Sequence, residues 1–258
     1  MRRISKTTPR SLFKIAKMEQ ELKIKTADGK YIYGKLRGSL KRPLIVFVHG
    51  MTGHMDEHIF FNGARYVEKK GFSSFRFNLY DWRKGARKLA NCTIAIHARD
   101  LDKVIEYFRR RGSQKVFVVG HSYGGPTILS SHKKQFDAAV LWDPTSYFSW
   151  VGKARLVKPL NKYLIGEDWG FEFVLGPRLI QEAERIDIHK LIRKISRPIK
   201  IILAGKNLLL KPGKKLYTSA HAPKALKIIP GATHTFDEDG AEEKLFRETY
   251  DWLKRWIY

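Results

Sequence analysis

The chain has 258 residues, of which 43% are hydrophobic, so it is long enough for one large α/β domain with a substantial core. Its formal charge of +25 favours anionic partners and weak adhesion to anionic surfaces. No recognisable nucleic-acid-binding module accompanies that charge, so we expect solvated basic faces and no specific nucleic-acid site. Cys92 is the only cysteine, which excludes an intramolecular disulfide and a cysteine-based zinc site.

The N-terminal stretch is basic and carries no apolar segment typical of a secretory signal, so residues 1–20 are predicted to form a basic tail or helix. No apolar run approaches the ~20 residues that span a bilayer. Together with the single cysteine, these features lead us to expect a cytoplasmic protein. Its oligomeric state is left open.

Strand and helix patterns alternate along most of the chain. Alternating apolar and polar residues on either side of Asp28-Gly29 predict a β-hairpin over 21–27 and 30–37. Short apolar runs predict buried strands at 43–48, 73–78, 116–119, 138–142, 198–204 and 225–230. Amphipathic patterns predict helices at 57–70, 93–111 and 240–258. Strands that alternate with helices imply a mainly parallel sheet covered on both faces.

The most informative motif follows the strand at 116–119. Gly120-His121-Ser122-Tyr123-Gly124 has the form Gly-x-Ser-x-Gly and leads directly into a helix-compatible stretch. A sharp strand–turn–helix connection of this kind forces the serine into a strained conformation with positive φ and holds its hydroxyl outward. The sequence therefore predicts that Ser122 is a nucleophile at such a turn.

Two further loops follow predicted buried strands, one before this motif and one after it. His49-Gly50 follows the buried strand at 43–48, and Gly231-Ala232-Thr233-His234 follows the strand at 225–230. A histidine in a loop after the last strand can reach the serine as its general base. Of the nine histidines, His234 alone occupies such a loop, whereas His49 is expected to be structural.

With these three loops in this order, the chain from about residue 21 to the C-terminus resembles the α/β-hydrolase family. The first loop, His-Gly-x-Thr-Gly, is similar to that of small carboxylesterases, including feruloyl and cinnamoyl esterases. The resemblance implies an α/β-hydrolase fold: a mostly parallel sheet of about eight strands, flanked by helices, with a small cap. It also implies an oxyanion hole formed by the backbone N–H groups of Tyr123 and Met51.

The acid of the expected triad departs from the common family pattern. Most members carry an aspartate after the penultimate strand, but here that strand is followed by Lys206-Asn207-Leu208, with no carboxylate. Asp143 caps the earlier strand at 138–142 and is the preferred candidate. Asn207, which could orient the histidine through its amide oxygen, and another carboxylate such as Asp237 remain alternatives.

Residues 145–197 do not follow the strand–helix rhythm and are rich in aromatic side chains. The resemblance implies that this insertion is a cap over the serine, with residues 21–144 and 198–258 forming the core. We expect Trp169 and Phe171 to line the substrate pocket and residues 176–194 to be helical.

The sequence thus predicts a serine hydrolase of carboxylic esters that acts through an acyl-enzyme on a small-molecule substrate. It is expected to need no cofactor and to bind no metal. The alternatives are a binding protein of the same fold without turnover, or a thioesterase, peptidase or acyltransferase, because all these enzymes share the acyl-enzyme chemistry.

Overall fold

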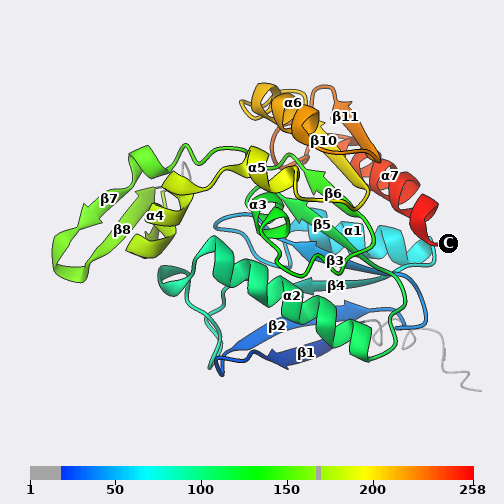
Figure 1. Ribbon diagram of the computed structural model, residues 1–258, viewed down its shortest axis with the longest axis horizontal. Coiled ribbons are helices and arrows are strands. Elements are labelled where there is room, and N and C mark those ends of the chain that lie inside the picture. The colour runs from blue at the N-terminus through cyan, green and yellow to red at the C-terminus, as the bar shows by residue number, and fades with distance from the viewer. Residues whose placement is uncertain (1–18, 167–169) are drawn as a thin grey trace, which may run out of the picture.

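A computed structural model describes residues 19–166 and 170–258. Its centre is an eight-stranded sheet in the order β1-β2-β4-β3-β5-β6-β10-β11 (Figure 1). The bounds of its strands are β1 Glu19–Lys25, β2 Tyr31–Arg37, β3 Leu44–Val48, β4 Ser73–Phe77, β5 Val116–His121, β6 Ala139–Trp142, β10 Ile199–Ala204 and β11 Lys224–Ile229. The β1–β2 hairpin joins β4 in antiparallel fashion, and the six strands from β4 to β11 run parallel.

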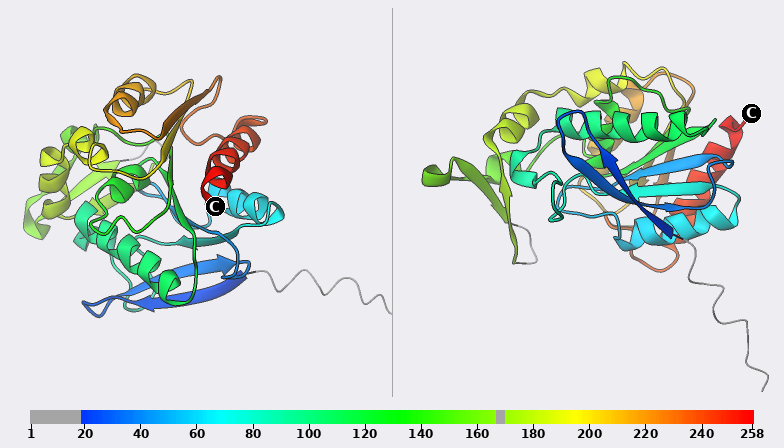
Figure 2. Two further views of the ribbon diagram at one scale, coloured as in Figure 1. Left: turned by 45° about the vertical axis from the view of Figure 1, so that its right-hand side comes forward. Right: turned by 90° about the horizontal axis from the view of Figure 1, so that it is seen from below.

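Helices cover both faces of this sheet (Figure 2). Their bounds are α1 His58–Lys69, α2 Ile94–Arg110, α3 Gly124–Leu129, α4 Pro177–Arg185, α5 Ile188–Ile192, α6 Leu210–Ser219 and α7 Ala241–Leu253. Apolar side chains of α1 and α7 pack into one buried cluster with the sheet, and those of the other helices pack into a second cluster on the opposite face. The fold is therefore that of an α/β hydrolase, as the sequence predicts.

The inserted segment forms a second, small sheet that projects from the body (Figures 1 and 2). It is antiparallel, in the order β7-β8-β9, with bounds β7 Arg155–Val157, β8 Lys162–Gly166 and β9 Glu172–Leu175. Short 3-10 turns are η1 Leu89–Asn91, η2 Val151–Lys153, η3 Lys158–Leu160 and η4 Lys254–Trp256. Ile165 and Leu175 are buried and belong to the same apolar cluster as Leu179 of α4, so one face of this sheet belongs to the core.

Two local predictions were wrong. The expected helix over 176–194 is interrupted, because Ile186 is extended and Asp187 starts α5 by accepting a hydrogen bond from Lys190 N. No helix was predicted after Asn207, but the structure contains α6 there. Pro212 lies in the first turn of α6, where a proline removes no helical hydrogen bond. None of the helices in the described residues has the length and apolar composition needed to cross a bilayer.

Candidate active site

Ser122 lies at the apex of a tight turn between β5 and α3. Its φ of +52° is in the left-handed region, which a side chain rarely adopts without constraint from its surroundings. The two flanking glycines permit the turn. A Cβ on Gly124 would lie 2.2 Å from Val48 O, and one on Gly120 would lie 2.6 Å from Ile128 Cδ1. The Gly-x-Ser-x-Gly spacing is thus explained by the close approach of β3, β5 and α3.

The hydroxyl of Ser122 is partly exposed and has one hydrogen-bond partner among the described residues, Thr145 Oγ1 at 3.3 Å. Thr145 N also donates to Ser122 O at 3.0 Å, so the start of the inserted segment is tied to the turn. Within the described part of the chain, no hydrogen bond joins the Ser122 hydroxyl to His234. Catalytic hydrogen bonds are often loose without substrate, so this geometry does not remove His234 from consideration.

His234 and Asp143 come from different loops and meet at the carboxyl edge of the sheet. His234 Nδ1 lies 2.6 Å from Asp143 Oδ2, and the imidazole is 36% exposed whereas the Asp143 side chain is fully buried. Ala204 N donates to Asp143 Oδ1 at 3.2 Å. A carboxylate held in this way accepts a proton-bearing Nδ1, which leaves Nε2 of His234 as the proton acceptor.

Asn207 reaches the same carboxylate. Its side-chain Nδ2 donates to Asp143 Oδ2, and its Oδ1 accepts a hydrogen bond from Leu209 N at 3.3 Å. That second bond fixes the amide orientation, so the nitrogen faces Asp143 and His234. The two acid candidates of the sequence analysis therefore lie together, with the amide of Asn207 as a donor to the carboxylate.

Asp237, the remaining acid candidate, points elsewhere. Its Oδ1 accepts hydrogen bonds from the hydroxyls of Thr235, at 2.9 Å, and Thr233, at 3.4 Å. It makes no hydrogen bond to His234 among the described residues.

His121, which the sequence analysis did not single out, holds the His234 loop. Burial lowers the pKa of His121 well below its ordinary value, so the ring is neutral. Its Nε2–H donates to His234 O at 2.8 Å, and the centroids of the two imidazole rings are 4.6 Å apart. A histidine at the end of an otherwise apolar buried strand was the available sequence signal.

The loop after β3 lies against Ser122. A Cβ on Gly50 would be 3.2 Å from Ser122 Cβ, so this loop approaches the serine at Gly50. His49 fixes this loop: its Nδ1–H donates to Gly50 O at 2.7 Å, and its Nε2 accepts from Leu79 N at 2.9 Å. Burial lowers the pKa of His49 to about 4, which keeps it neutral and supports the expectation of a structural role.

The N–H groups of Met51 and Tyr123 are available for a ligand, since neither donates a hydrogen bond within residues 19–166 and 170–258. The Tyr123 side chain is buried, with its hydroxyl 3.0 Å from His97 Nδ1. This contact anchors the residue whose backbone follows the serine.

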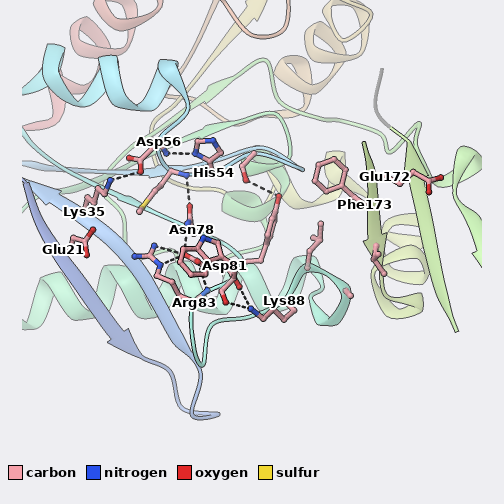
Figure 3. Close-up of a pocket in the computed structure, with 17 residues that line it drawn as sticks. Glu21, Lys35, His54, Asp56, Asn78, Asp81, Arg83, Lys88, Glu172 and Phe173 are labelled. Atoms are coloured by element: carbon pink, nitrogen blue, oxygen red, sulfur yellow. Dashed lines mark hydrogen bonds and ion pairs between the residues drawn. The ribbon is translucent and has the colours of Figure 1, made fainter. Parts of the chain in front are cut away.

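A cavity of about 770 Å³ adjoins this edge of the sheet, between the loops after β3 and β4 and strand β9 of the cap (Figure 3). Gly53 and Tyr80 are among its lining residues, and the ring of Phe173 points into it from β9. Ser122, Asp143 and His234 are not among its lining residues, whereas Gly53 to Asp56 of the loop after β3 are.

Of the two aromatic residues expected in the pocket, the structure describes only Phe171. Phe171 is 68% exposed and does not line the cavity, whereas Phe173, two residues later, does. Trp169 lies outside the described residues. Sequence alone could not separate these rings because all three fall in one aromatic run.

This chain belongs to the alpha/beta hydrolase family, whose model matches residues 45–244. No curated protein sequence matches it.

Similar solved structures include the esterase Est1E from Butyrivibrio proteoclasticus with bound ferulic acid, at 19% identity and a TM-score of 0.77, covering 92% of this chain and 99% of that one. They also include the esterase domain of a Rhodothermus marinus protein, at 16% identity and a TM-score of 0.73, covering 93% of this chain and 99% of that one. A third is the Pyrococcus furiosus esterase Pf2001, at 17% identity and a TM-score of 0.70, covering 100% of this chain and 99% of that one. At such identities, the likeness establishes the fold alone.

Proposed function

We propose that the chain is a serine hydrolase that cleaves carboxylic esters through an acyl-enzyme. The observation that carries this proposal is the 2.6 Å pair of His234 Nδ1 and Asp143 Oδ2 at the sheet edge where the strained Ser122 lies. A histidine held by a buried carboxylate, at the same edge of the sheet as a serine on a turn of positive φ, is an arrangement that supports acyl transfer.

In the first half of the reaction, Ser122 Oγ leaves Thr145 Oγ1 and attacks the ester carbonyl carbon. Nε2 of His234 takes the hydroxyl proton, and Asp143 stabilises the imidazolium that forms. The N–H groups of Tyr123 and Met51 donate to the carbonyl oxygen as it gains negative charge. The tetrahedral intermediate then collapses, the C–O bond to the alcohol breaks, and His234 returns the proton to the leaving alcohol.

In the second half, a water molecule attacks the acyl-enzyme with His234 Nε2 as its base. The acid leaves and the proton returns to Ser122 Oγ, so the enzyme is regenerated. These steps need no cofactor. The non-reacting part of the substrate would extend past the Gly50–Gly53 turn into the cavity between Tyr80 and Phe173, which is large enough for a small organic group.

Covalent labelling with a fluorophosphonate tests the nucleophile. We expect the folded protein to label on Ser122 and the Ser122→Ala variant not to label. Ser130→Ala removes a hydroxyl at the end of α3 and should leave labelling unchanged. A folded wild-type protein that does not label would favour the alternative of a binding protein without turnover.

A panel of esters, thioesters and anilides with matched acyl groups tests the substrate class. We expect the esters to be hydrolysed fastest, with activity lost in Ser122→Ala. Faster turnover of thioesters or anilides would instead assign a thioesterase or a peptidase with the same acyl-enzyme chemistry.

A further inference from the structure

The hairpin of β7 and β8 lies at the end of the molecule farthest from the C-terminus and projects from the body (Figure 1; Figure 2, right). The 3-10 turn η3 forms its tip, and Asn161 in the left-handed conformation closes that turn. The residues from 153 to 162 therefore form a protrusion, hereafter the cap hairpin.

Apolar side chains are exposed on the cap hairpin. Leu156 is 44% exposed and Leu160, at the tip, is 67% exposed. Nine large apolar side chains are exposed among the described residues, and four of these belong to the small cap sheet and its turns: Leu156, Leu160, Phe171 and Val174. The strand register places Val174 on the opposite face of the small sheet from Leu156, so the interaction surface is limited to Leu156 and Leu160 of the cap hairpin.

The charge on the cap hairpin has one sign. Its sequence, Lys-Ala-Arg-Leu-Val-Lys-Pro-Leu-Asn-Lys, contains four cations and no carboxylate. Arg155 pairs with Glu172 at 3.1 Å, and Lys162 donates to Ala90 O at 3.1 Å. Lys153 and Lys158 are exposed, and their ammonium groups make no hydrogen bond or ion pair within the described part of the chain. Two uncompensated lysines thus flank the exposed leucines.

We propose that the cap hairpin docks on an anionic phospholipid bilayer, with Leu160 among the upper acyl chains and Lys153 and Lys158 at the lipid phosphates. Exposed leucines beside unpaired lysines on a protruding tip match the apolar and anionic layers of such a surface. This proposal rests on the surface alone and does not depend on the proposed ester hydrolysis.

Protein partners and a second copy of the chain fit this surface less well. The cores of protein–protein interfaces are depleted in lysine, and the tip is convex with cations on both sides of its leucines. Pairing of β7 edge to edge with a second copy would bring like charges together, and Pro159 follows directly at the tip.

Sedimentation of the full chain with vesicles tests the proposal. The vesicles are phosphatidylcholine alone or an equal mixture of phosphatidylcholine and phosphatidylglycerol, at physiological ionic strength. We expect binding to the mixed vesicles only. Leu160→Asp, and separately Lys153→Glu with Lys158→Glu, should each lower the partition coefficient by about tenfold or more.

Matched variants on another face separate docking from adhesion through net charge. Lys214→Glu with Lys215→Glu makes the same charge change on exposed residues of α6, and Leu208→Asp alters a leucine that is 86% exposed. We expect both controls to bind within about twofold of the wild type, with thermal unfolding unchanged in all variants. Equal losses in the controls would overturn the proposal, as would a wild type that binds neither vesicle.

Size-exclusion chromatography with light scattering tests whether the cap hairpin instead mediates self-association. If the wild type dimerises and Leu160→Asp makes it monomeric, while vesicle binding is unaffected, the cap hairpin is a self-association surface and the lipid proposal fails.

Discussion

Asp143 is the residue through which the proposed chemistry is most directly tested. Its buried Oδ2 accepts from both His234 Nδ1 and Asn207 Nδ2, and the backbone holds it at a φ of +40°. In Asp143→Asn, an amide nitrogen facing the ring would favour the tautomer with Nε2 protonated, which cannot accept the serine proton. We expect kcat to fall by roughly three to four orders of magnitude, measured on an ester in the folded variant.

Asn207→Ala is the matched control for this assignment. It removes one donor to the carboxylate but leaves the charge and the His234 contact, so we expect at most about a tenfold loss in kcat, consistent with the loss of one hydrogen bond to a charged group. Equal losses in the two variants, or near-normal turnover in Asp143→Asn, would assign the acid role elsewhere.

Glu57 offers a second prediction at the level of a single residue. It precedes α1, and its carboxylate packs on Gly53, where a Cβ would lie 2.6 Å from Oε2. That oxygen is buried and has no hydrogen-bond partner in the described residues. Burial raises the pKa of Glu57 to about 7; a hydrogen bond with the His54 backbone and the charges of His58 and His234 lower it only in part.

The sign of the resulting pH dependence follows from proton linkage. Glu57 is ionised in the unfolded chain above pH ~4.5 but stays protonated in the fold up to about pH 7. Its contribution to stability is therefore complete at low pH and is lost as the pH rises through 7. We expect Glu57→Gln to unfold at a higher temperature than the wild type at pH 8, with a smaller difference at pH 5. A difference independent of pH would contradict a buried titrating carboxyl.

The close contact of β3 with the serine turn is a property of two elements. Because a Cβ on Gly124 would lie 2.2 Å from Val48 O, Gly124→Ala must separate the end of β3 from the turn. We expect a loss of roughly 1–3 kcal/mol or more in the free energy of unfolding, measured by urea denaturation, together with loss of fluorophosphonate labelling. Gly152→Ala in η2, where a Cβ meets no atom within 4 Å, should change neither.

The cap sheet carries a prediction about the substrate. Phe173 lines the cavity from β9, so Phe173→Ala should enlarge it and raise the kcat/KM of longer acyl esters relative to short ones, by about tenfold. The ratio of the two kcat/KM values does not depend on the fraction of enzyme that is folded. A change in this ratio therefore reports on the pocket and not on stability. Phe171→Ala is the control, because that ring is 68% exposed. A flat chain-length profile in both variants would place the acyl group outside this cavity.

Strongly patterned elements were predictable from sequence, and the small sheet of β7, β8 and β9 was not. The run Leu44–Val48 is apolar throughout, and a central parallel strand is the structure that buries such a run on both faces. In the cap, β7 has three residues and β8 has five, and basic residues interrupt the period-two pattern. Short strands with one buried face leave a weak signal, so the sequence indicated an insertion there but not its sheet.

At the candidate site, the sequence motifs located individual residues. Contacts between segments that are distant in the sequence could not be predicted from them. Gly-x-Ser-x-Gly fixes Ser122 because the turn itself demands that spacing. The meeting of Asp143 with Asn207, 64 positions apart, depends on β6 and β10 being neighbours with parallel register. The same holds for His121 and the backbone of His234.

For the whole molecule, three buried histidines predict how stability changes with acid. Burial lowers the pKa of His49 to about 4 and that of His97 to about 3, and it places the pKa of His121 well below its ordinary value. All three bind a proton near pH 6.5 once unfolded, so the unfolded state takes up protons that the fold excludes. Their contribution to stability is complete above pH ~6.5 and is lost as the pH falls toward 4.

Glu57 acts in the opposite direction between pH ~7 and ~4.5, but it is one group against three. Unfolding near pH 5 should therefore take up about two protons. The free energy of unfolding should then fall by roughly 3 kcal/mol for each unit by which the pH is lowered in this range. Protonation of further carboxylates adds to a charge that is already +25, which increases repulsion in the compact state.

Urea midpoints between pH 7 and pH 4.5 measure the slope of the free energy of unfolding with pH. His97→Phe, which keeps an aromatic ring without a titrating nitrogen, should lower the slope by about one proton. A wild-type slope near zero would mean that these histidines titrate in the folded protein.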